Sequence, residues 1–417
     1  MPWRKPWNAS LSTDERSQRA YEVWVSEIML QQTQVATVIP YYDRWMKRFP
    51  TVHKLAEASI EDVNAVWKGL GYYSRASRLH AGSKVVQNEY AGIIPSEPAV
   101  LEKSIPGIGR YSAGAICSIA HGSQAPVLDG NVHRLLSRIL GLHANPTAKR
   151  TLAILWQAAT DLVTGASVPG DLNQALIELG STVCKPRAPS CAACPVQSSC
   201  VAYRLGDSCG AVVDIEDAAR PSTAPTGEQC SICIPLPITG GVTRFPMAKV
   251  RKKPREEIDA AFVISCSKWV LLAKRPEKGL LGGLWEFPTV PADSVDASAD
   301  SVLRQRIVDE DRGPTALQVK SQRAAGDVLH IFSHIRKTWQ VMLVELEFDP
   351  ELSEGSEVVA RLPELNKGAK WVRRDDINGA NLGTGTMKVW QAALGLLCPV
   401  ASSGNAAQGG RSRKQRS

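Results

Sequence analysis

Four cysteines close together in the sequence constrain this chain more than any other feature. Cys184, Cys191, Cys194 and Cys200 have six, two and five residues between successive members, and two of the gaps contain proline. Short turns of this kind can gather four thiolates into a tetrahedral cage that suits an iron–sulfur cluster or zinc, although zinc sites more often use two short-spaced pairs. Disulfides fit poorly, because the N-terminal residues lack a signal-peptide pattern and the chain has the character of a protein from a reducing compartment. Four separate buried thiols are the remaining alternative, and we predict a metal or cluster site.

The composition is ordinary for a globular protein. The 417 residues are enough for two or three domains, each with its own core. Hydrophobic residues make up 44% and charged residues 22%, and no apolar run approaches the roughly 18 residues that span a bilayer, so we expect no membrane contact. The net charge of +8, from 49 basic and 41 acidic residues, is compatible with a polyanionic partner. The basic end of the chain, 399–417, predicts a disordered tail that serves as a nuclear address, touches phosphates nonspecifically, or has no role.

Helical periodicity dominates the first half of the chain. Apolar residues at helical spacing predict helices over 14–48, with a break at Pro40, and over 60–67 and 74–88. Glu27 stands among large apolar side chains, which would raise the proton affinity of its carboxyl and suit a general acid near neutral pH. A solvent-facing glutamate on an amphipathic helix is the alternative.

Two short stretches have the composition of DNA-contacting loops. The run 31–34, Gln-Gln-Thr-Gln, is polar where a packed helix needs no polarity, and such side chains bond well to bases. In the turn 69–73, Gly-Leu-Gly-Tyr-Tyr, two glycines can push Leu70 and Tyr72 outward as wedges for a base stack. A tyrosine pair that caps the helical core is the alternative for this turn.

A glycine-rich turn and an aspartate lie further along the helical half. In 105–110, Ile-Pro-Gly-Ile-Gly-Arg, the glycines at Gly107 and Gly109 permit a tight turn and leave N–H groups free at the start of the next helix. This helix-hairpin-helix pattern holds a DNA backbone without reading its sequence, whereas an ordinary helix–helix turn is the alternative. Asp129 precedes another helix, which it can cap, and it can also place a carboxylate beside positive charge at a sugar carbon.

The pattern changes after the cysteine segment. Residues 206–258 are rich in small residues and proline and lack sustained periodicity, which predicts a linker. Cys209, Cys230 and Cys233 lie within it as candidate ligands of a linker zinc, with free thiols as the alternative because a fourth ligand is not apparent. Beyond it an α+β domain is expected, with strands over 260–265, 270–273, 339–348 and 370–372 and helices over 302–309 and 386–397.

The order of these features resembles the adenine DNA glycosylases of the MutY type, which remove adenine mispaired with 8-oxoguanine. The resemblance runs from Trp3 to about Leu397 and includes 26–37, 69–75, 105–116, 128–132, the four cysteines and 332–334. It implies a multidomain fold: an all-α helix-hairpin-helix glycosylase domain with a 4Fe–4S cluster over 1–205, a linker over 206–258, an α+β Nudix-like domain over 259–398 and the tail over 399–417. The cluster ligands would be Cys184, Cys191, Cys194 and Cys200.

The resemblance also implies roles for single residues. Glu27 matches the glutamate that protonates the adenine ring, and Asp129 matches the aspartate that stabilises the oxocarbenium-like sugar. The other matches are Tyr111 and Asn131 at supporting catalytic positions, Trp3, Arg4, Leu30 and Glu178 around the flipped adenine, Gln32, Leu70 and Tyr72 as duplex wedges, Thr33 as a lesion contact, and Phe332, Ser333 and His334 in the loop that reads 8-oxoguanine. Base flipping is required because the glycosidic bond is out of reach inside the stack.

The family further implies a substrate and a setting. The substrate is duplex DNA with 8-oxoguanine:A or G:A mispairs, the partners are a sliding clamp or mismatch repair proteins, and the protein acts as a monomer in the nucleus, with the mitochondrion as a second location. Three features depart from the pattern. The chain begins just before Trp3, where relatives have a preceding helix, so we expect a short or misassigned start. Cys209 is not at the spacing of the animal zinc linker, and the Nudix hydrolase signature is missing after Gly283, so we expect lesion recognition without pyrophosphate hydrolysis.

Three other functions were weighed. An endonuclease III-like glycosylase that also cleaves the strand needs a lysine where this chain has Tyr111. A non-catalytic lesion-binding protein would not need both Glu27 and Asp129. A Nudix hydrolase with a DNA-binding appendage would need metal-binding glutamates that the sequence lacks.

Overall fold

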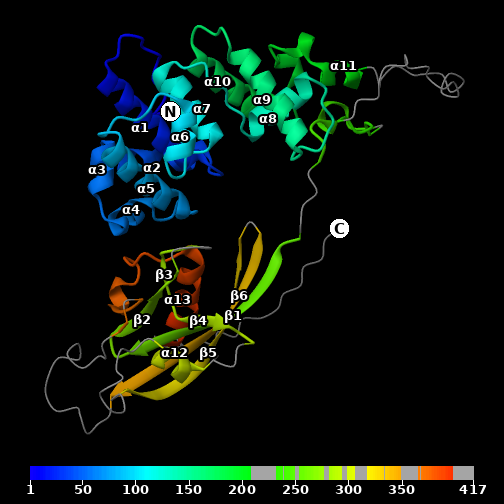
Figure 1. Cartoon of the computed structure of the whole chain (residues 1–417). Helices are drawn as coiled ribbons and strands as arrows, with labels where there is room; N and C mark the ends of the chain where they lie inside the picture. The colour runs from blue at the N-terminus through cyan, green and yellow to red at the C-terminus, as the bar shows by residue number, and fades with distance from the viewer. Residues whose placement is uncertain are drawn as a thin grey trace, which may run out of the picture. The chain divides into compact units, whose positions relative to one another are not determined.

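The computed structural model of the chain describes residues 1–207, 232–237, 239–248, 253–276, 281–293, 298–305, 317–332, 334–348, 365–366 and 368–397 (Figure 1). The chain divides into two compact units, Met1–Lys252 and Lys253–Ser417. Several predictions fall on residues outside the described ones, namely those for Cys209, Cys230, Ser333 and the tail 399–417. No helix among the described residues is both long enough and apolar enough to cross a bilayer.

The first unit is helical. Its α-helices are α1 (Thr13–Leu30), α2 (Val35–Arg48), α3 (Val52–Glu57), α4 (Ile60–Trp67), α5 (Ser74–Glu89), α6 (Pro98–Ser104), α7 (Arg110–His121), α8 (Gly130–Ile139), α9 (Lys149–Val163), α10 (Pro169–Glu178) and α11 (Val201–Asp207). A π-helical turn, Leu179–Val183, and two 3-10 turns, Cys191–Ala193 and Gln197–Ser199, lead through the cysteine segment.

The central helix of this unit is α1. Ser12 and Glu15 form a capping box at its start, which satisfies N–H groups that have no partner inside the helix. The helix packs against α2, α5 and α7, with Trp24 fully buried (Figure 1). Gly114 lets α7 approach its neighbours, since a Cβ there would lie 2.1 Å from the main-chain oxygen of Pro126. This small residue therefore lets the segment that leads into α8 pack directly on α7.

The break in the first predicted helix lies at residues 31–34, so the predicted break at Pro40 is wrong. α1 ends at Leu30, Gln32 adopts a left-handed backbone with φ of 56°, and α2 starts at Val35. Pro40 lies in the second turn of α2, where it removes a single intrahelical hydrogen bond. The polar run 31–34 is consequently a loop at the end of the helix that carries Glu27.

Part of the predicted linker packs on the helical unit. The amide of Ile234 bonds to the carbonyl of His143 at 2.8 Å, and a 3-10 turn, Gly241–Arg244, packs against α11. Phe245 is fully buried, and its carbonyl accepts a hydrogen bond from Arg138. Within the predicted linker, 206–258, the described residues 232–237 and 239–248 therefore lie on the helical unit, with Phe245 buried, and the first strand already starts at Arg255.

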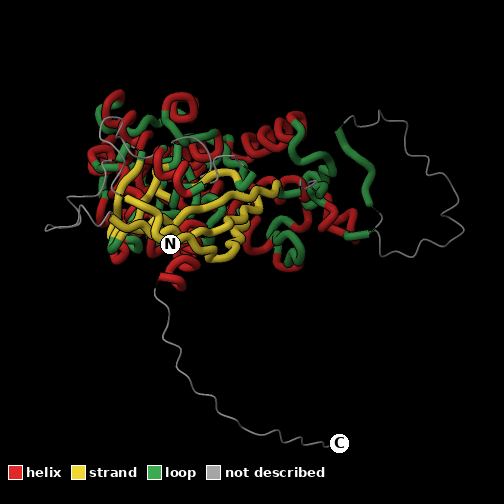
Figure 2. Tube along the Cα trace, turned by 90° about the horizontal axis from the view of Figure 1, so that it is seen from below, coloured by secondary structure: helices red, strands yellow, loops and turns green. Residues whose placement is uncertain are grey.

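The second unit is an α+β domain built on one mixed sheet. Its elements are β1 (Arg255–Cys266), β2 (Trp269–Lys274), β3 (Trp285–Glu286), β4 (Thr289–Pro291), α12 (Ala299–Arg304), β5 (Leu317–Ile331), β6 (Ile335–Phe348), β7 (Ala369–Arg373) and α13 (Thr384–Leu397). The strand order is β3-β2-β1-β6-β5, with β4 beside β1 and β7 beside β2. β1 and β6 are parallel and the other pairs are antiparallel. Figure 2 shows these strands, in yellow, as one twisted sheet.

Both faces of this sheet are covered. On β1, Val263 belongs to a buried cluster with Trp390 of α13, whereas its neighbour Phe262 belongs to another with Val302 of α12. Alternate side chains of a strand point to opposite faces, so the two clusters are the two apolar layers of a sheet between helices. The predicted loop at 332–334 falls between β5 and β6, which pair as a long antiparallel hairpin up to Ile331 and Arg336. Strand β5 was not predicted, because most of its residues are exposed and its sequence does not alternate regularly between apolar and polar residues.

Candidate functional site

A large cavity lies between the end of α1, the start of α7 and α8, and α10. Its volume is about 810 Å³, which is within the usual size of a ligand pocket. Of the residues predicted for the active site and its DNA contacts, the cavity lining includes Trp3, Arg4, Glu27, Leu30, Gln32, Thr33, Tyr111, Asp129, Asn131 and Glu178. Residues up to 175 positions apart in the sequence therefore meet at one site.

Glu27 is the group with the most distinctive chemistry in this cavity. The pKa of its carboxyl is raised to about 7: burial is the largest cause and raises it, a hydrogen bond from Tyr111 lowers it, and the nearby charge of Asp129 raises it. That hydrogen bond joins the Tyr111 hydroxyl to Oε2 of Glu27 over 2.7 Å. Burial raises the pKa of the Tyr111 hydroxyl as well, so it remains a donor at neutral pH. At neutral pH the Glu27 carboxyl therefore carries a proton in a substantial fraction of molecules and can transfer it to a bound base.

Asp129 is held rigidly at the N-terminus of α8. Its Oδ1 accepts from the main-chain N–H groups of Asn131 (2.9 Å) and Val132 (2.7 Å), and its Oδ2 accepts from the Asn131 side chain (2.8 Å). The residue is therefore the helix cap that the sequence predicts, and the cap turns a carboxylate toward the cavity. The cap and the chemical role are compatible.

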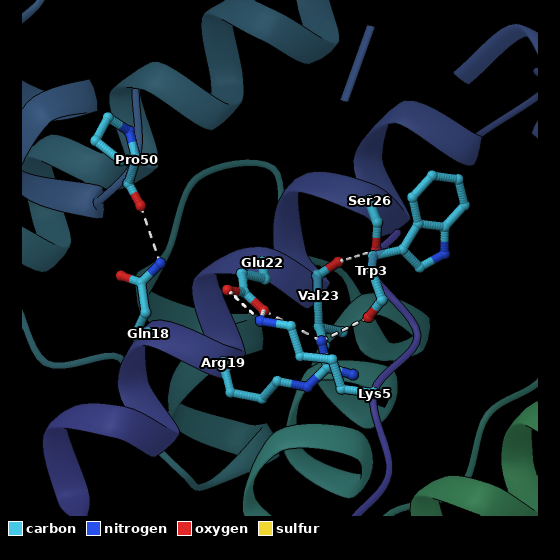
Figure 3. A network of polar contacts seen from close by, with 8 residues as sticks. All are labelled: Trp3, Lys5, Gln18, Arg19, Glu22, Val23, Ser26 and Pro50. Atoms are coloured by element: carbon cyan, nitrogen blue, oxygen red, sulfur yellow. Dashed lines mark hydrogen bonds and ion pairs between the residues drawn. The ribbon is translucent and has the colours of Figure 1, made fainter. Parts of the chain in front are cut away.

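The N-terminal residues form one wall of the cavity, and two sets of charges hold them. Figure 3 shows the Arg19 guanidinium between the Trp3 carbonyl, at 2.6 Å, and Glu22, whose carboxylate also accepts from Lys5. Arg19 and Glu22 both belong to α1. The Trp3 ring packs edge-on against Tyr42 with centroids 5.2 Å apart.

The next residue in this wall reaches the opposite side of the cavity. Arg4 donates to Glu178 (2.7 Å) and Gln174 (3.1 Å), both on α10. The N-terminal strap, Met1–Lys5, therefore connects α1 to α10 across the cavity. Arg19, Glu22 and Gln174 were not predicted from the sequence, because the strap residues that they bond lie 16 or more positions away in the chain.

The turn 69–73 exposes only one of its two predicted wedge residues. Tyr72 is 47% exposed, as a wedge requires, but Leu70 is buried, so the expectation that the turn pushes Leu70 outward is wrong for the free protein. Gly69 and Gly71 both have positive φ and fold the turn so that Leu70 and Tyr73 point into the core. The roles of these residues on DNA stay predictions.

The glycine turn at 105–109 joins α6 to α7 as a helical hairpin. Gly107 has φ of 85°, and a Cβ there would lie 2.7 Å from the Arg78 side chain, so this position requires glycine. Gly109 is the exposed N-cap of α7 and has no side-chain cap, which leaves N–H groups at the helix start free for an anion.

The four cysteines of the predicted cage lie together around one cavity. Leu135, Ile139 and Val196 are among its apolar walls. Burial raises the pKa of the Cys191 thiol, and the neighbouring sulfur groups of Cys184, Cys200 and Cys194 raise it further, as expected for side chains that lie close together.

Two arginines of α8 hold this segment, and neither was predicted from the sequence. Arg138 is 1% exposed and donates to Cys184 Sγ (3.2 Å) and to the Lys185 carbonyl (2.8 Å). Arg134 donates to the Cys184 carbonyl (2.8 Å) and to the Asn131 side chain (3.0 Å), which bonds Asp129. Their spacing of four residues on one helix could have indicated a shared face.

The predicted loop of the second domain is only partly described. Phe332 is partly buried against the core, its ring meets His330 edge-on at 4.5 Å, and its amide bonds to the Ile335 carbonyl at 2.8 Å. His334 is exposed. Of the linker cysteines, Cys233 is exposed, and the others lie outside the described residues.

A carboxyl ready to give up a proton, a second carboxylate in the same cavity and a helical hairpin define a base-excision DNA glycosylase of the helix-hairpin-helix class, here joined to a Nudix-type domain. A family model described as HhH-GPD superfamily base excision DNA repair protein matches residues 25–160, and one described as NUDIX domain matches residues 260–392. The predicted fold class is confirmed.

Relatives carry the comparison over most of the chain. The chain is 40% identical to the human adenine DNA glycosylase, over 95% of this chain and 71% of that protein, and 41% identical to the rat one, over 94% and 74%. It is 35% identical to the adenine DNA glycosylase of Schizosaccharomyces pombe, over 94% of this chain and 86% of that protein. The chain belongs to the adenine DNA glycosylase family, which confirms the resemblance recognised from the sequence.

Proposed function

We propose that this protein removes adenine from G:A and 8-oxoguanine:A mispairs in duplex DNA by hydrolysing the N-glycosidic bond. The observation that carries the proposal is the pairing of Glu27, whose pKa is raised to about 7, with Asp129 in one cavity. A buried carboxyl with a raised pKa suits the proton donor, and a carboxylate that accepts three hydrogen bonds beside it suits the group that stabilises positive charge. The names of the relatives supply the base, adenine.

The geometry supports a stepwise reaction. The adenosine flips out of the duplex, and its base enters the cavity, because the glycosidic bond cannot be reached inside the stack. Protonated Glu27 gives its proton to a ring nitrogen of adenine, the C1′–N9 bond breaks with its electron pair passing to the base, and adenine leaves as a neutral molecule. The carboxylate of Asp129 stabilises the positive charge left on the sugar. Water then adds to C1′ and releases a proton, which regenerates the acid when Glu27 accepts it.

Strand cleavage by Schiff-base chemistry fits less well. That reaction requires an amine nucleophile beside the sugar. None of the described residues that line the cavity is a lysine, and the hydroxyl of Tyr111 is directed at Glu27 instead. We therefore propose a monofunctional glycosylase.

The cysteine segment fits a 4Fe–4S cluster. Cys184, Cys191, Cys194 and Cys200 line one cavity, as the four sulfur ligands of such a cluster require, and Arg138 donates a hydrogen bond to the Cys184 sulfur. Bound there, the cluster would cross-link the segment that follows α10 and fix it against α8. Iron and sulfide analysis of purified protein, with the broad visible absorption of such clusters, tests this; a single zinc per chain would contradict it.

The second domain is proposed to recognise 8-oxoguanine. Phe332 directly follows β5, and His334, just before β6, is exposed. The support is the Nudix-type fold together with the family resemblance at these residues.

Adenine release tests the proposed function directly. The protein is incubated in single turnover with G:A, 8-oxoguanine:A and T:A duplexes, and free adenine and cut strands are measured with and without alkali. We expect adenine from both mispairs, little from T:A, and cut strands only after alkali. Strand cutting without alkali would indicate the bifunctional chemistry, and no adenine from any duplex would refute the proposal.

A further inference from the structure

One buried arginine joins the loop that follows α1 to the turn that precedes α5. Arg75 is the second residue of α5 and is 8% exposed. Its Nη1 donates to the main-chain carbonyls of Ile28 (2.9 Å), Met29 (2.9 Å) and Gln31 (2.6 Å). The last carbonyls of an α-helix have no partner within the helix, so Arg75 caps the end of α1 from another element.

The other nitrogen of the same guanidinium reaches the second loop. Its Nη2 donates to the carbonyls of Gly71 (3.1 Å) and Leu70 (3.4 Å) and to the Thr33 hydroxyl (3.4 Å). Thr33 belongs to loop 31–34, and the other two belong to turn 69–73. One planar group thus bonds to both segments that the sequence analysis identified as DNA contacts.

Each loop contains a residue that needs support. Gln32 has φ of 56° and Tyr72 has φ of 48°, a region that costs a side-chain-bearing residue free energy and persists only where the surroundings enforce it. The Arg75 guanidinium lies 5.3 Å from the ring of Trp67 and 5.4 Å from the ring of Tyr72, so it also fixes the exposed tyrosine by a cation–π contact.

The charge of the arginine is retained at this site. Burial lowers the pKa of Arg75 to about 10, which leaves it protonated at neutral pH. A positive charge at the C-terminus of α1 is favourable, because that end of a helix carries partial negative charge. Lysine could keep the charge, but it has one nitrogen and cannot bond to both loops in the plane of a guanidinium.

We propose that Arg75 is a positioning residue for base extrusion, which sets the separation of loop 31–34 and turn 69–73 before DNA is bound. It touches neither base nor sugar and acts through Gln32, Thr33 and Tyr72. The inference rests on the proposed function, since a wedge matters only to an enzyme that must unstack a base. Because Arg75 fixes both loops in advance, no free energy is spent on ordering them when they insert into the duplex. The effect of Arg75 on the rate of base extrusion should therefore be largest where the target base is hardest to unstack.

Two duplexes separate this role from a general structural one. Both carry the same G:A mispair; in one it is flanked by G·C pairs, and in the other a neighbouring pair is also mismatched, which loosens the stack. Single-turnover adenine release is measured for the wild type and for Arg75→Lys and Arg75→Gln. The concentration of active enzyme in each preparation is first taken from the burst amplitude with substrate in excess, so that active enzyme exceeds DNA in every single-turnover reaction. We expect both variants to be slowed about tenfold or more on the tightly stacked duplex and less than about threefold on the loosened one.

Arg19→Lys is the matched control. Arg19 is also a buried arginine that bonds a main-chain carbonyl, but it holds the N-terminal strap and neither loop. Its substitution is expected to slow release by the same factor on both duplexes. Equal slowing by the Arg75 variants on the two duplexes, no slowing on either, or loss of folding in both variants would overturn the inference. A wild type that releases no adenine from either duplex would instead refute the proposed function.

Discussion

The hydrogen bond between Tyr111 and Glu27 predicts a shift in the pH dependence of base removal. The Tyr111 hydroxyl lowers the pKa of Glu27 against the larger effect of burial. A hydrogen bond to a charged group is worth roughly 1.5–3 kcal/mol, and one pKa unit corresponds to about 1.4 kcal/mol, so Tyr111→Phe should raise the pKa of Glu27 by roughly one unit or more.

The sign follows from the role of the acid. Adenine release requires protonated Glu27. The rate constant is therefore at its maximum at low pH and falls as pH rises through the pKa of Glu27, about 7 in the wild type. In Tyr111→Phe this alkaline limb should move to about pH 8 or above. Asp129→Asn should shift the alkaline limb in the opposite direction. The charge of Asp129 raises the pKa of Glu27, so removing that charge moves the limb to lower pH. The plateau of Asp129→Asn should also fall, since the stabilising charge at the sugar is lost.

Single-turnover rates across about pH 5.5 to 9.5 on a G:A duplex would measure both limbs. Using enzyme in excess separates the chemical step from product release. A limb that stays in place in both variants, or moves in the same direction in both, would refute the assignment of the limb to Glu27.

Three further predictions address other parts of the structure. Cys191→Ser should lower the iron content and the visible absorption per chain and reduce the yield of folded protein, as loss of one cluster ligand requires; unchanged iron would contradict the ligand assignment. Removing 253–417 should leave adenine release from G:A largely intact while reducing the preference for 8-oxoguanine:A, measured as the ratio of single-turnover rates; an unchanged ratio would refute the sensing role. Gly114→Ala should destabilise the helical unit by about 1–3 kcal/mol in denaturant unfolding, because its Cβ would meet the Pro126 carbonyl; a loss under about 0.5 kcal/mol would show that α7 can move away.

The sequence predicted well what depends on local pattern. Helix 60–67 matches α4, and helix 74–88 differs from α5 by one residue. The cysteine spacing predicted that the four thiols lie together, and Asp129 is the expected helix cap. Each of these predictions depends only on a few neighbouring residues, whose helix propensity, capping side chains or turn-forming residues determine the local structure.

The remainder depends on contacts between distant residues. Pro40 sits inside α2 because the helix tolerates one missing bond, and the break occurs where Gln32 takes a left-handed backbone. Leu70 turns inward because two glycines with positive φ direct it there. Phe245 is buried 107 positions from Arg138, to which it bonds, so no local pattern could separate it from a linker.

The site shows the same division. Glu27, Tyr111 and Asp129 were identified from motifs, but the hydrogen bond between the first two and the charges that hold the N-terminal strap are tertiary facts. The arginines Arg75, Arg134 and Arg138 were missed because arginine on a helix is most often solvent-exposed. Most of their partners are main-chain carbonyls, which no side-chain pattern in the sequence reveals.

The most direct test of the account is Glu27→Gln assayed on one 8-oxoguanine:A duplex for both binding and single-turnover adenine release. The substitution keeps the shape of the side chain and removes the transferable proton, so the account predicts unchanged duplex affinity and a rate lower by at least about a hundredfold. Adenine release at the wild-type rate by this variant would show that another group supplies the proton.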